Sequence, residues 1–206
     1  MRVEVKTIAV IGADAVGCGI ASIAAQSGYD TVLEDVSEER LAKAAAWITR
    51  DHESLVAGGA PEARGRDAAA ARLSLAHTVE DAIRDADLII ETLPDEMEMQ
   101  IELFTILDKF AKPNAIFASA GFLSITELAE ITFCANRCIG MRFLESGEGR
   151  KVVKLIKLVK GAETTYETIT RCALVAHRMG REVVVLDETA PNRAGESERK
   201  LANAQD

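Results

Sequence analysis

The chain has 206 residues, of which 48% are hydrophobic and 28% charged, a composition typical of one globular domain with a core of its own. Its 24 basic and 33 acidic side chains give a formal net charge of −9, which argues against nucleic acid and anionic membranes as partners. The apolar run near the N-terminus breaks at Gly12 and Asp14, unlike a secretory signal peptide, and no apolar stretch reaches the roughly 18 residues of a membrane span. We therefore expect a cytoplasmic protein.

Short apolar and β-branched runs alternate along the chain with longer runs of helical spacing. The predicted strands are Thr7–Ile11, Thr31–Glu34, Arg72–Ala76, Asp87–Glu91, Ala115–Ser119, Cys138–Phe143, Val152–Val159 and Glu182–Leu186. The predicted helices are Ala15–Ser27, a helix capped by Ser37 that runs to about Val56, Val79–Arg84, Glu98–Phe110, Ile125–Ile131 and Thr165–Met179. This alternation predicts an α/β fold: a doubly wound, mostly parallel sheet of the Rossmann type with helices on both faces. The polar residues 188–206 read as a tail that follows the domain.

The cysteines form no CxxC pair, and no histidine lies near the two closest ones, Cys134 and Cys138. This spacing predicts no metal site. It is typical of buried, reduced thiols in a cytoplasmic protein. The full set is Cys18, Cys134, Cys138 and Cys172.

The first strand ends in a glycine-rich turn, the place where a doubly wound sheet binds dinucleotides. The dinucleotide fingerprint requires G-x-G-x-x-G and an acid about 20 residues later. Here the turn reads Gly12-Ala13-Asp14-Ala15-Val16-Gly17. The first and third glycines are therefore present, and Asp35 stands where the acid would bind a ribose.

Asp14 replaces the second glycine, which normally lets a pyrophosphate approach the N-terminus of the helix. A carboxylate there adds bulk and negative charge, and one like-charge contact at about 4 Å costs roughly 1 to 4 kcal/mol. The alternative interpretation is that Asp14 is the N-cap of the helix. In both interpretations its carboxylate takes the place of an anion, so we predict that NAD can bind but that its binding is weakened.

Five segments, taken in order, carry a resemblance to a known family: IAVIGADAVGCGIASIAAQSGYDTVLEDVSEE, DADLIIETLPDEMEM, AIFASAGFLSITELA, IGMRF and KLIKLVKGAETT. Together they resemble the NAD-binding domain of the L-3-hydroxyacyl-CoA dehydrogenase family, to which 3-hydroxybutyryl-CoA dehydrogenase belongs. The resemblance covers roughly residues 5–187, and it implies a dinucleotide-binding-like domain over residues 1–187 followed by the tail 188–206.

Relatives in that family also carry a helical C-terminal domain, which forms the dimer and closes over the acyl-CoA. The resemblance implies that this chain ends where that domain would begin. The surface that the domain covers in relatives would then be exposed here. We therefore predict self-association, or a partner protein, at that surface.

The resemblance assigns the catalytic positions of the family to residues of a different chemistry. The histidine that acts as general base corresponds to Arg142, and the glutamate that orients it corresponds to Lys157. Arginine cannot accept a proton at any workable pH, so no catalytic residue of the family is intact. Two cations in the cleft would instead suit a carboxylate or phosphate, which predicts a small anionic ligand.

The resemblance assigns further residues to the same cleft. No serine falls on the family's substrate-binding position, and Ser119 and Ser124 are the nearest substitutes. Gln100 replaces a lysine that approaches the cofactor in the family. Glu91, at the end of a strand that faces the cofactor cleft, is the best remaining polar site residue. Its alternative interpretation is a solvated carboxylate at a strand end.

The sequence is compatible with two functions. The first is a pseudoenzyme: a non-catalytic relative of 3-hydroxyacyl-CoA dehydrogenase that binds a ligand or a protein and binds NAD weakly. The second is an NAD-dependent oxidoreductase of that family whose active site is rearranged or completed by a partner chain. Asp14, Arg142 and Lys157 are the residues that separate the two.

Overall fold

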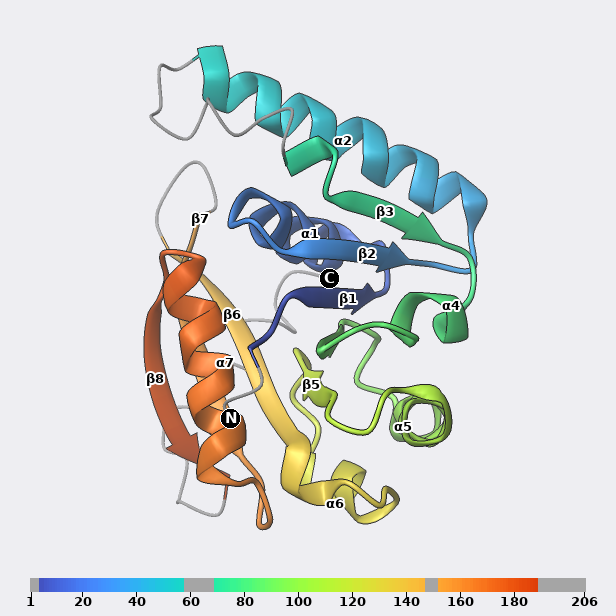
Figure 1. The fold of residues 1–206 in the computed structure, drawn as a ribbon, viewed down its shortest axis with the longest axis vertical. Helices are drawn as coiled ribbons and strands as arrows, with labels where there is room; N and C mark the ends of the chain where they lie inside the picture. Colours follow the sequence, from blue (N-terminus) through green and yellow to red (C-terminus); the bar gives the residue numbers. More distant parts are fainter. Residues whose placement is uncertain (1–3, 58–68, 147–151, 189–206) are drawn as a thin grey trace.

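The computed structural model describes residues 4–57, 69–146 and 152–188. Its strands form one eight-stranded sheet in the order β3-β2-β1-β4-β5-β6-β7-β8 (Figure 1). All neighbouring strands are parallel except β6 and β7, which are antiparallel. The strands are β1 (Thr7–Ile11), β2 (Asp30–Glu34), β3 (Leu73–Ala76), β4 (Leu88–Glu91), β5 (Ile116–Ser119), β6 (Cys138–Ser146), β7 (Val152–Lys160) and β8 (Glu182–Asp187).

Helices cover the sheet on both faces and divide the core into two clusters. Side chains of α1, α2 and α7 pack into one cluster, and those of α4, α5 and α6 pack into the other. The helices are α1 (Ala15–Gln26), α2 (Glu38–Ala57), α4 (Val79–Ile83), α5 (Met97–Phe110), α6 (Ile125–Glu130) and α7 (Tyr166–Arg178), with a short 3-10 helix η2 (Ala135–Arg137) before β6. The prediction of a doubly wound, mostly parallel α/β sheet is confirmed.

Most element boundaries agree with the sequence prediction to within one or two residues. The largest difference is β6, which runs to Ser146 rather than ending at Phe143. Its extra residues pair with β7 in an antiparallel ladder that shifts register between Leu144 and Glu145. Pairing with a partner strand, which the local sequence does not specify, therefore sets the length of this strand.

The strand order brings the carboxyl ends of several strands together on one side of the sheet, where the candidate site lies. Because β1, β2, β4 and β5 run parallel, their carboxyl ends meet at the same edge. The order reverses between β1 and β4, the switch point at which sheets of this kind bind ligands. The glycine-rich turn follows β1 at this edge.

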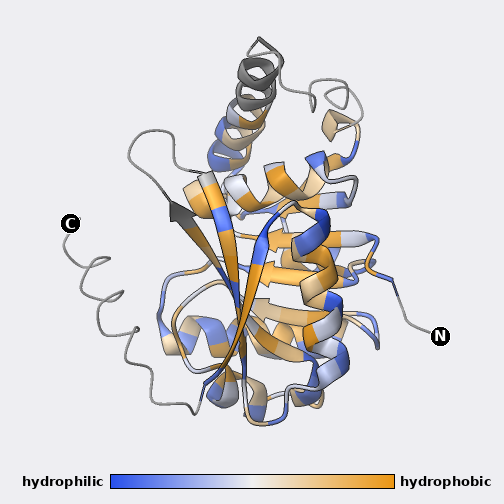
Figure 2. Ribbon diagram, turned by 90° about the vertical axis from the view of Figure 1, so that its left-hand side faces the viewer, coloured by the Kyte–Doolittle hydropathy of each residue, from blue (hydrophilic) through white to orange (hydrophobic). Residues whose placement is uncertain are grey.

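Part of one sheet face, over β6, β7 and β8, lies outside both core clusters. Cross-strand register puts Leu144 opposite Leu155 and Lys157 opposite Val184 on this face. We name it the β6–β8 face; besides the buried Val159, its apolar members are Leu144, Leu155, Val184 and Leu186. These last four side chains are half-buried or exposed, and Figure 2, which looks at this end of the molecule, shows apolar residues along the strands.

No helix in the described ranges is both long enough and apolar enough to cross a membrane.

Candidate functional site

The turn after β1 has the backbone geometry that the glycine pattern predicts. Gly12 has a φ of 104°, and a Cβ there would lie 2.7 Å from Oγ1 of Thr92. A Cβ on Gly17 would lie 1.9 Å from the carbonyl oxygen of Gly12. The two glycines therefore let β1, α1 and the residue after β4 approach closely, as the first and third positions of the fingerprint require.

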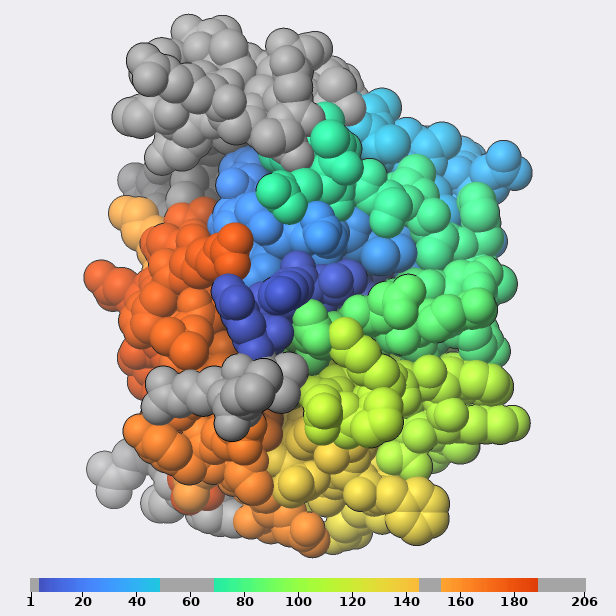
Figure 3. Space-filling model, in the orientation of Figure 1, coloured from blue at the N-terminus to red at the C-terminus, as the bar shows by residue number. Residues whose placement is uncertain are grey.

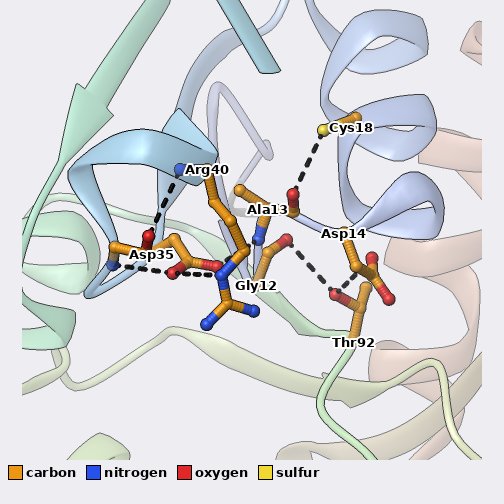
Figure 4. Close-up of polar contacts among 8 residues, drawn as sticks. Gly12, Ala13, Asp14, Cys18, Asp35, Arg40 and Thr92 are labelled. Carbon is orange, nitrogen blue, oxygen red and sulfur yellow. Dashed lines mark hydrogen bonds and ion pairs between the residues drawn. The ribbon is translucent and has the colours of Figure 1, made fainter. Parts of the chain in front are cut away.

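Asp14 caps helix α1. It is exposed, and its Oδ1 accepts a hydrogen bond from the backbone N–H of Gly17 at 2.7 Å (Figure 4). The hydroxyl of Thr92 donates to Ile11 O at 3.1 Å and lies 3.5 Å from the same Asp14 oxygen. The N-cap interpretation is confirmed, so the positive end of the α1 dipole carries a carboxylate of the chain itself.

Asp35, at the carboxyl end of β2, lies against the same turn and is 4% exposed. Its Oδ2 accepts from the backbone N–H of Ala13 at 3.0 Å, and its Oδ1 accepts from Ser37 N at 2.8 Å. Nε of Arg40, from the first turn of α2, lies 3.2 Å from Oδ1 (Figure 4). Asp35 is thus where the fingerprint predicts it, but both of its oxygens already have partners within the chain.

Glu91 is fully buried at the end of β4, between Ile11 of β1 and Ser119 of β5. The solvated interpretation of this carboxylate is therefore wrong, because parallel strands flank β4 on both sides. Its Oε2 accepts from Leu93 N at 2.8 Å, whereas Oε1 has no hydrogen-bond partner in the described part of the chain. Burial raises the pKa of Glu91 to about 7, although the nearby Ser119 hydroxyl and the Leu93 amide oppose this rise.

The serines proposed as substitutes have structural partners. Ser119 is buried, and its hydroxyl accepts from Gly121 N at 3.2 Å. Ser124 is the N-cap of α6 and accepts from Glu127 N at 3.2 Å. Gln100 is buried in α5 and donates to Pro94 O at 3.2 Å, so it too holds the loop rather than reaching outward.

Arg142 and Lys157 come together, as the resemblance implies. They are direct cross-strand partners on β6 and β7, and both are half-buried. Nε of Arg142 donates to Gly121 O at 3.2 Å, and its guanidinium lies 4.9 Å from the centre of the Phe122 ring. The basic residues Lys154 and Lys160 differ from Lys157 by an odd number of positions, so they belong to the other face of β7.

Three contacts of the site could not be read from the sequence. Thr92 joins β4 to the glycine turn, and Arg40 pairs with Asp35. Asp95 accepts from Phe122 N at 2.8 Å and so fixes the loop on which Arg142 rests. The only available signal was the position of Thr92 and Asp95 just after β4, at the carboxyl edge of the sheet.

The four cysteines are buried, as predicted. Burial, assisted by the nearby Asp14 and Asp35 carboxylates, raises the pKa of Cys18 to about 11, and burial raises that of Cys172 to about 12. Within the described ranges, no cluster of three or more histidine, cysteine or acidic side chains has the arrangement of a metal site.

Comparison with known proteins assigns the chain to a family. The family model described as "3-hydroxyacyl-CoA dehydrogenase, NAD binding domain" matches residues 7–189. The chain belongs to this family. The resemblance seen in the sequence is thereby confirmed.

Curated relatives are considerably longer than the part that matches. The chain is 32% identical over 189 residues to a 3-hydroxybutyryl-CoA dehydrogenase of Bradyrhizobium diazoefficiens, and 33% identical over 190 residues to a probable 3-hydroxybutyryl-CoA dehydrogenase of Bacillus subtilis. These matches cover 91% and 90% of this chain but 63% of each relative. The chain therefore spans less than two thirds of the length of these relatives.

Solved structures agree with the family assignment. The crystal structure of a 3-hydroxybutyryl-CoA dehydrogenase from Escherichia coli K12 superposes with a TM-score of 0.83 at 28% identity. That match covers 98% of this chain and 44% of the other chain. The described fold is thus the family's dinucleotide-binding fold.

The residues of the glycine turn fit a dinucleotide only in part. Gly12 and Gly17 provide the tight backbone that the fingerprint needs. The carboxylate of Asp14, however, stands at the helix N-terminus, where a phosphate would bind. Asp35 would have to exchange or share existing hydrogen bonds to bind a ribose.

Proposed function

We propose that this chain is a non-catalytic member of the 3-hydroxyacyl-CoA dehydrogenase family that acts as a ligand- or protein-binding module with weakened NAD binding. The observation that carries the proposal is the environment of Arg142, the residue that the resemblance places at the position of the family's general base. Its Nε donates to Gly121 O at 3.2 Å, and a guanidinium has no lone pair to accept a proton at neutral pH. A base at this position is therefore lost.

Weakened NAD binding follows from the electrostatics of the turn. A bound pyrophosphate would lie near the N-terminus of α1, where Asp14 already accepts from Gly17 N at 2.7 Å. Binding would bring phosphate and carboxylate together or would displace the cap. Either event costs free energy, so the affinity falls relative to a turn with glycine at this position.

The ligand that suits the altered cleft is a small anion. Arg142 and Lys157 project from the same face of the sheet, because they are direct cross-strand partners. The Phe122 ring beneath the guanidinium limits its freedom and its hydration. A carboxylate or phosphate bound between the two cations would gain charge-assisted hydrogen bonds.

A protein partner would bind to the β6–β8 face. Leu144, Leu155, Val184 and Leu186 surround the two cations there without belonging to either core cluster. Such a face would be covered by a second copy of the chain or by another protein. Sedimentation velocity across a wide concentration range tests the first case, and a strictly monomeric profile would count against self-association.

One observation favours the alternative, an NAD-dependent oxidoreductase with a rearranged or partner-completed active site. Glu91 is buried beside Ser119, and burial raises its pKa to about 7. A carboxyl with such a pKa can take up and release a proton near neutral pH. It is the candidate base if the chain is catalytic.

A direct assay of NADH formation distinguishes the two functions. The purified chain is incubated with NAD⁺ and 3-hydroxybutyryl-CoA, and NADH formation is followed by absorbance, for wild type and Glu91→Gln. The proposal predicts no turnover by either protein. Turnover by the wild type that is lost in Glu91→Gln would establish the oxidoreductase function instead.

A further inference from the structure

Arg171 of α7 is a buried cation with incomplete hydrogen bonding. Its side chain is 8% exposed, and its Nη1 donates to Asn114 O at 3.1 Å. Its Nε and Nη2 are buried and have no hydrogen-bond partner in the described part of the chain. Nor does any carboxylate in the described ranges form an ion pair with this guanidinium. A buried, unpaired charge is unfavourable unless a counter-ion is supplied.

A small polar hollow of about 220 Å³ adjoins this guanidinium. Its wall includes Arg137, whose Nε donates to Ala115 O at 3.0 Å, and the two asparagines Asn114 and Asn136. The hollow therefore brings two guanidinium groups together. This set of donors is the chemistry that recognises an oxyanion.

The start of α7 forms the remaining wall. Thr165 is the N-cap of this 13-residue helix, and Thr168 lies in its first turn. Thr165 N donates to Asn136 O at 3.1 Å, which holds the helix start beside η2. In Figure 3 α7 packs against the segment that contains α6 and η2. The positive end of the helix dipole thus adds to the two arginines.

One group opposes an anion here. The Glu167 carboxylate also borders the hollow, but its side chain is exposed. Water screens it more strongly than it screens the buried Arg171. Two arginines and a helix N-terminus therefore outweigh one solvated acid.

The hollow is separate from the glycine turn. Asn114 precedes β5 and Arg137 precedes β6, so both lie at the amino ends of parallel strands. The glycine turn follows the carboxyl end of β1. The hollow and the dinucleotide-type site therefore occupy opposite edges of the sheet.

We propose that the hollow is a second binding site, which takes a tetrahedral oxyanion such as the phosphate group of a small molecule. The anion pairs with the guanidinium groups of Arg171 and Arg137 and accepts from the Nε and Nη2 donors of Arg171, since the hydroxyls of Thr165 and Thr168 already donate to Asn136 O. Arg171 and Glu167 also border a larger hollow of about 730 Å³ lined in part by Tyr29 and Leu174. The organic part of a phosphorylated ligand would have space there.

Thermal unfolding in inorganic phosphate tests this site, with sodium chloride at equal ionic strength as the reference. The wild type should unfold at a higher temperature in phosphate, and the midpoint should rise with phosphate concentration. Arg137→Ala should lose this shift, with the apparent affinity at least tenfold weaker. Arg171→Met should lose it as well, and Arg137→Ala keeps the test valid if Arg171→Met fails to fold.

Each protein is also compared in the Arg142→Ala background, which removes the other candidate anion site, and Lys154→Ala, which removes an exposed cation outside both sites, is the control. It should respond to phosphate as the wild type does, and sulfate should reproduce the shift if any tetrahedral oxyanion fits. A wild type without a phosphate-specific shift would overturn the proposal. So would, in the Arg142→Ala background, a shift that persists in Arg137→Ala or disappears in Lys154→Ala.

Discussion

Arg142 and Lys157 lie directly opposite each other across the antiparallel pair β6–β7, so one sheet face carries two adjacent cations. One of these cations, Arg142, is held in place because it stacks on Phe122 and donates a hydrogen bond to Gly121. An anion bound between the two side chains would accept charge-assisted hydrogen bonds from both. This geometry supports the proposal that the position which the resemblance assigns to proton transfer serves anion binding in this chain.

Arg142→Ala should weaken the binding of a small dianion such as malonate by about tenfold, because it removes one charge-assisted contact. Isothermal titration calorimetry of wild type and variant measures this change. Lys154→Ala is the matched control, since Lys154 belongs to the other face of β7. Equal malonate affinity in wild type, Arg142→Ala and Lys154→Ala would exclude the cleft as the binding site.

Gly17→Ala should destabilise the fold by several kcal/mol, roughly 3 or more, because its Cβ would lie 1.9 Å from Gly12 O and the turn must shift. Gly19→Ala, two residues later in the same helix, is the control. A Cβ there meets no atom within 4 Å, so the substitution should stabilise by about 0.5 to 1 kcal/mol. Urea denaturation of both variants gives the comparison, and similar effects at the two glycines would contradict the described geometry.

Glu91 should make the stability of the protein fall as the pH rises. Burial raises its pKa from 4.5 to about 7, so the folded state holds the proton more tightly than the unfolded state. The stabilisation is complete below pH 4.5 and is lost as the pH rises through 7. Its size is of the order of 3 kcal/mol, at 1.36 kcal/mol for each pKa unit.

Glu91→Gln keeps a neutral side chain of the same shape and should therefore gain stability over the wild type at pH 8 but not at pH 5. Urea denaturation at the two pH values measures this difference. Glu98→Gln is the control, at an exposed position of α5. Its free energy of unfolding should differ from that of the wild type by the same amount at both pH values. If Glu91→Gln behaved like Glu98→Gln, the buried carboxyl would not be the titrating group.

The sequence was sufficient for the fold because each element carries a local signal. Apolar runs predicted the buried strands, and the spacing of Gly12 and Gly17 predicted the turn between β1 and α1. Asp14 also has a local signal, since its side chain caps an amide three residues later.

The rest of the site depends on contacts between segments that are distant in the sequence. Glu91 is buried because β1 and β5 flank its strand, which its neighbours in the sequence do not reveal. The partners of Asp35 and the surroundings of Arg171 likewise come from packing. From the sequence alone, a basic residue on an amphipathic helix is predicted to be exposed, and only the packing of the helix shows that it is buried.

A calorimetric titration with NAD⁺ tests the central claim, that Asp14 weakens dinucleotide binding, most directly. Three proteins are compared: wild type, Asp14→Gly, and Asp14→Asn, which retains a capping side chain but removes its charge. We predict weak binding by the wild type and an affinity at least tenfold higher for Asp14→Gly, because one like-charge contact at about 4 Å costs roughly 1 to 4 kcal/mol. Asp14→Asn should recover part of that gain. Micromolar binding by the wild type, unchanged in both variants, would contradict the claim.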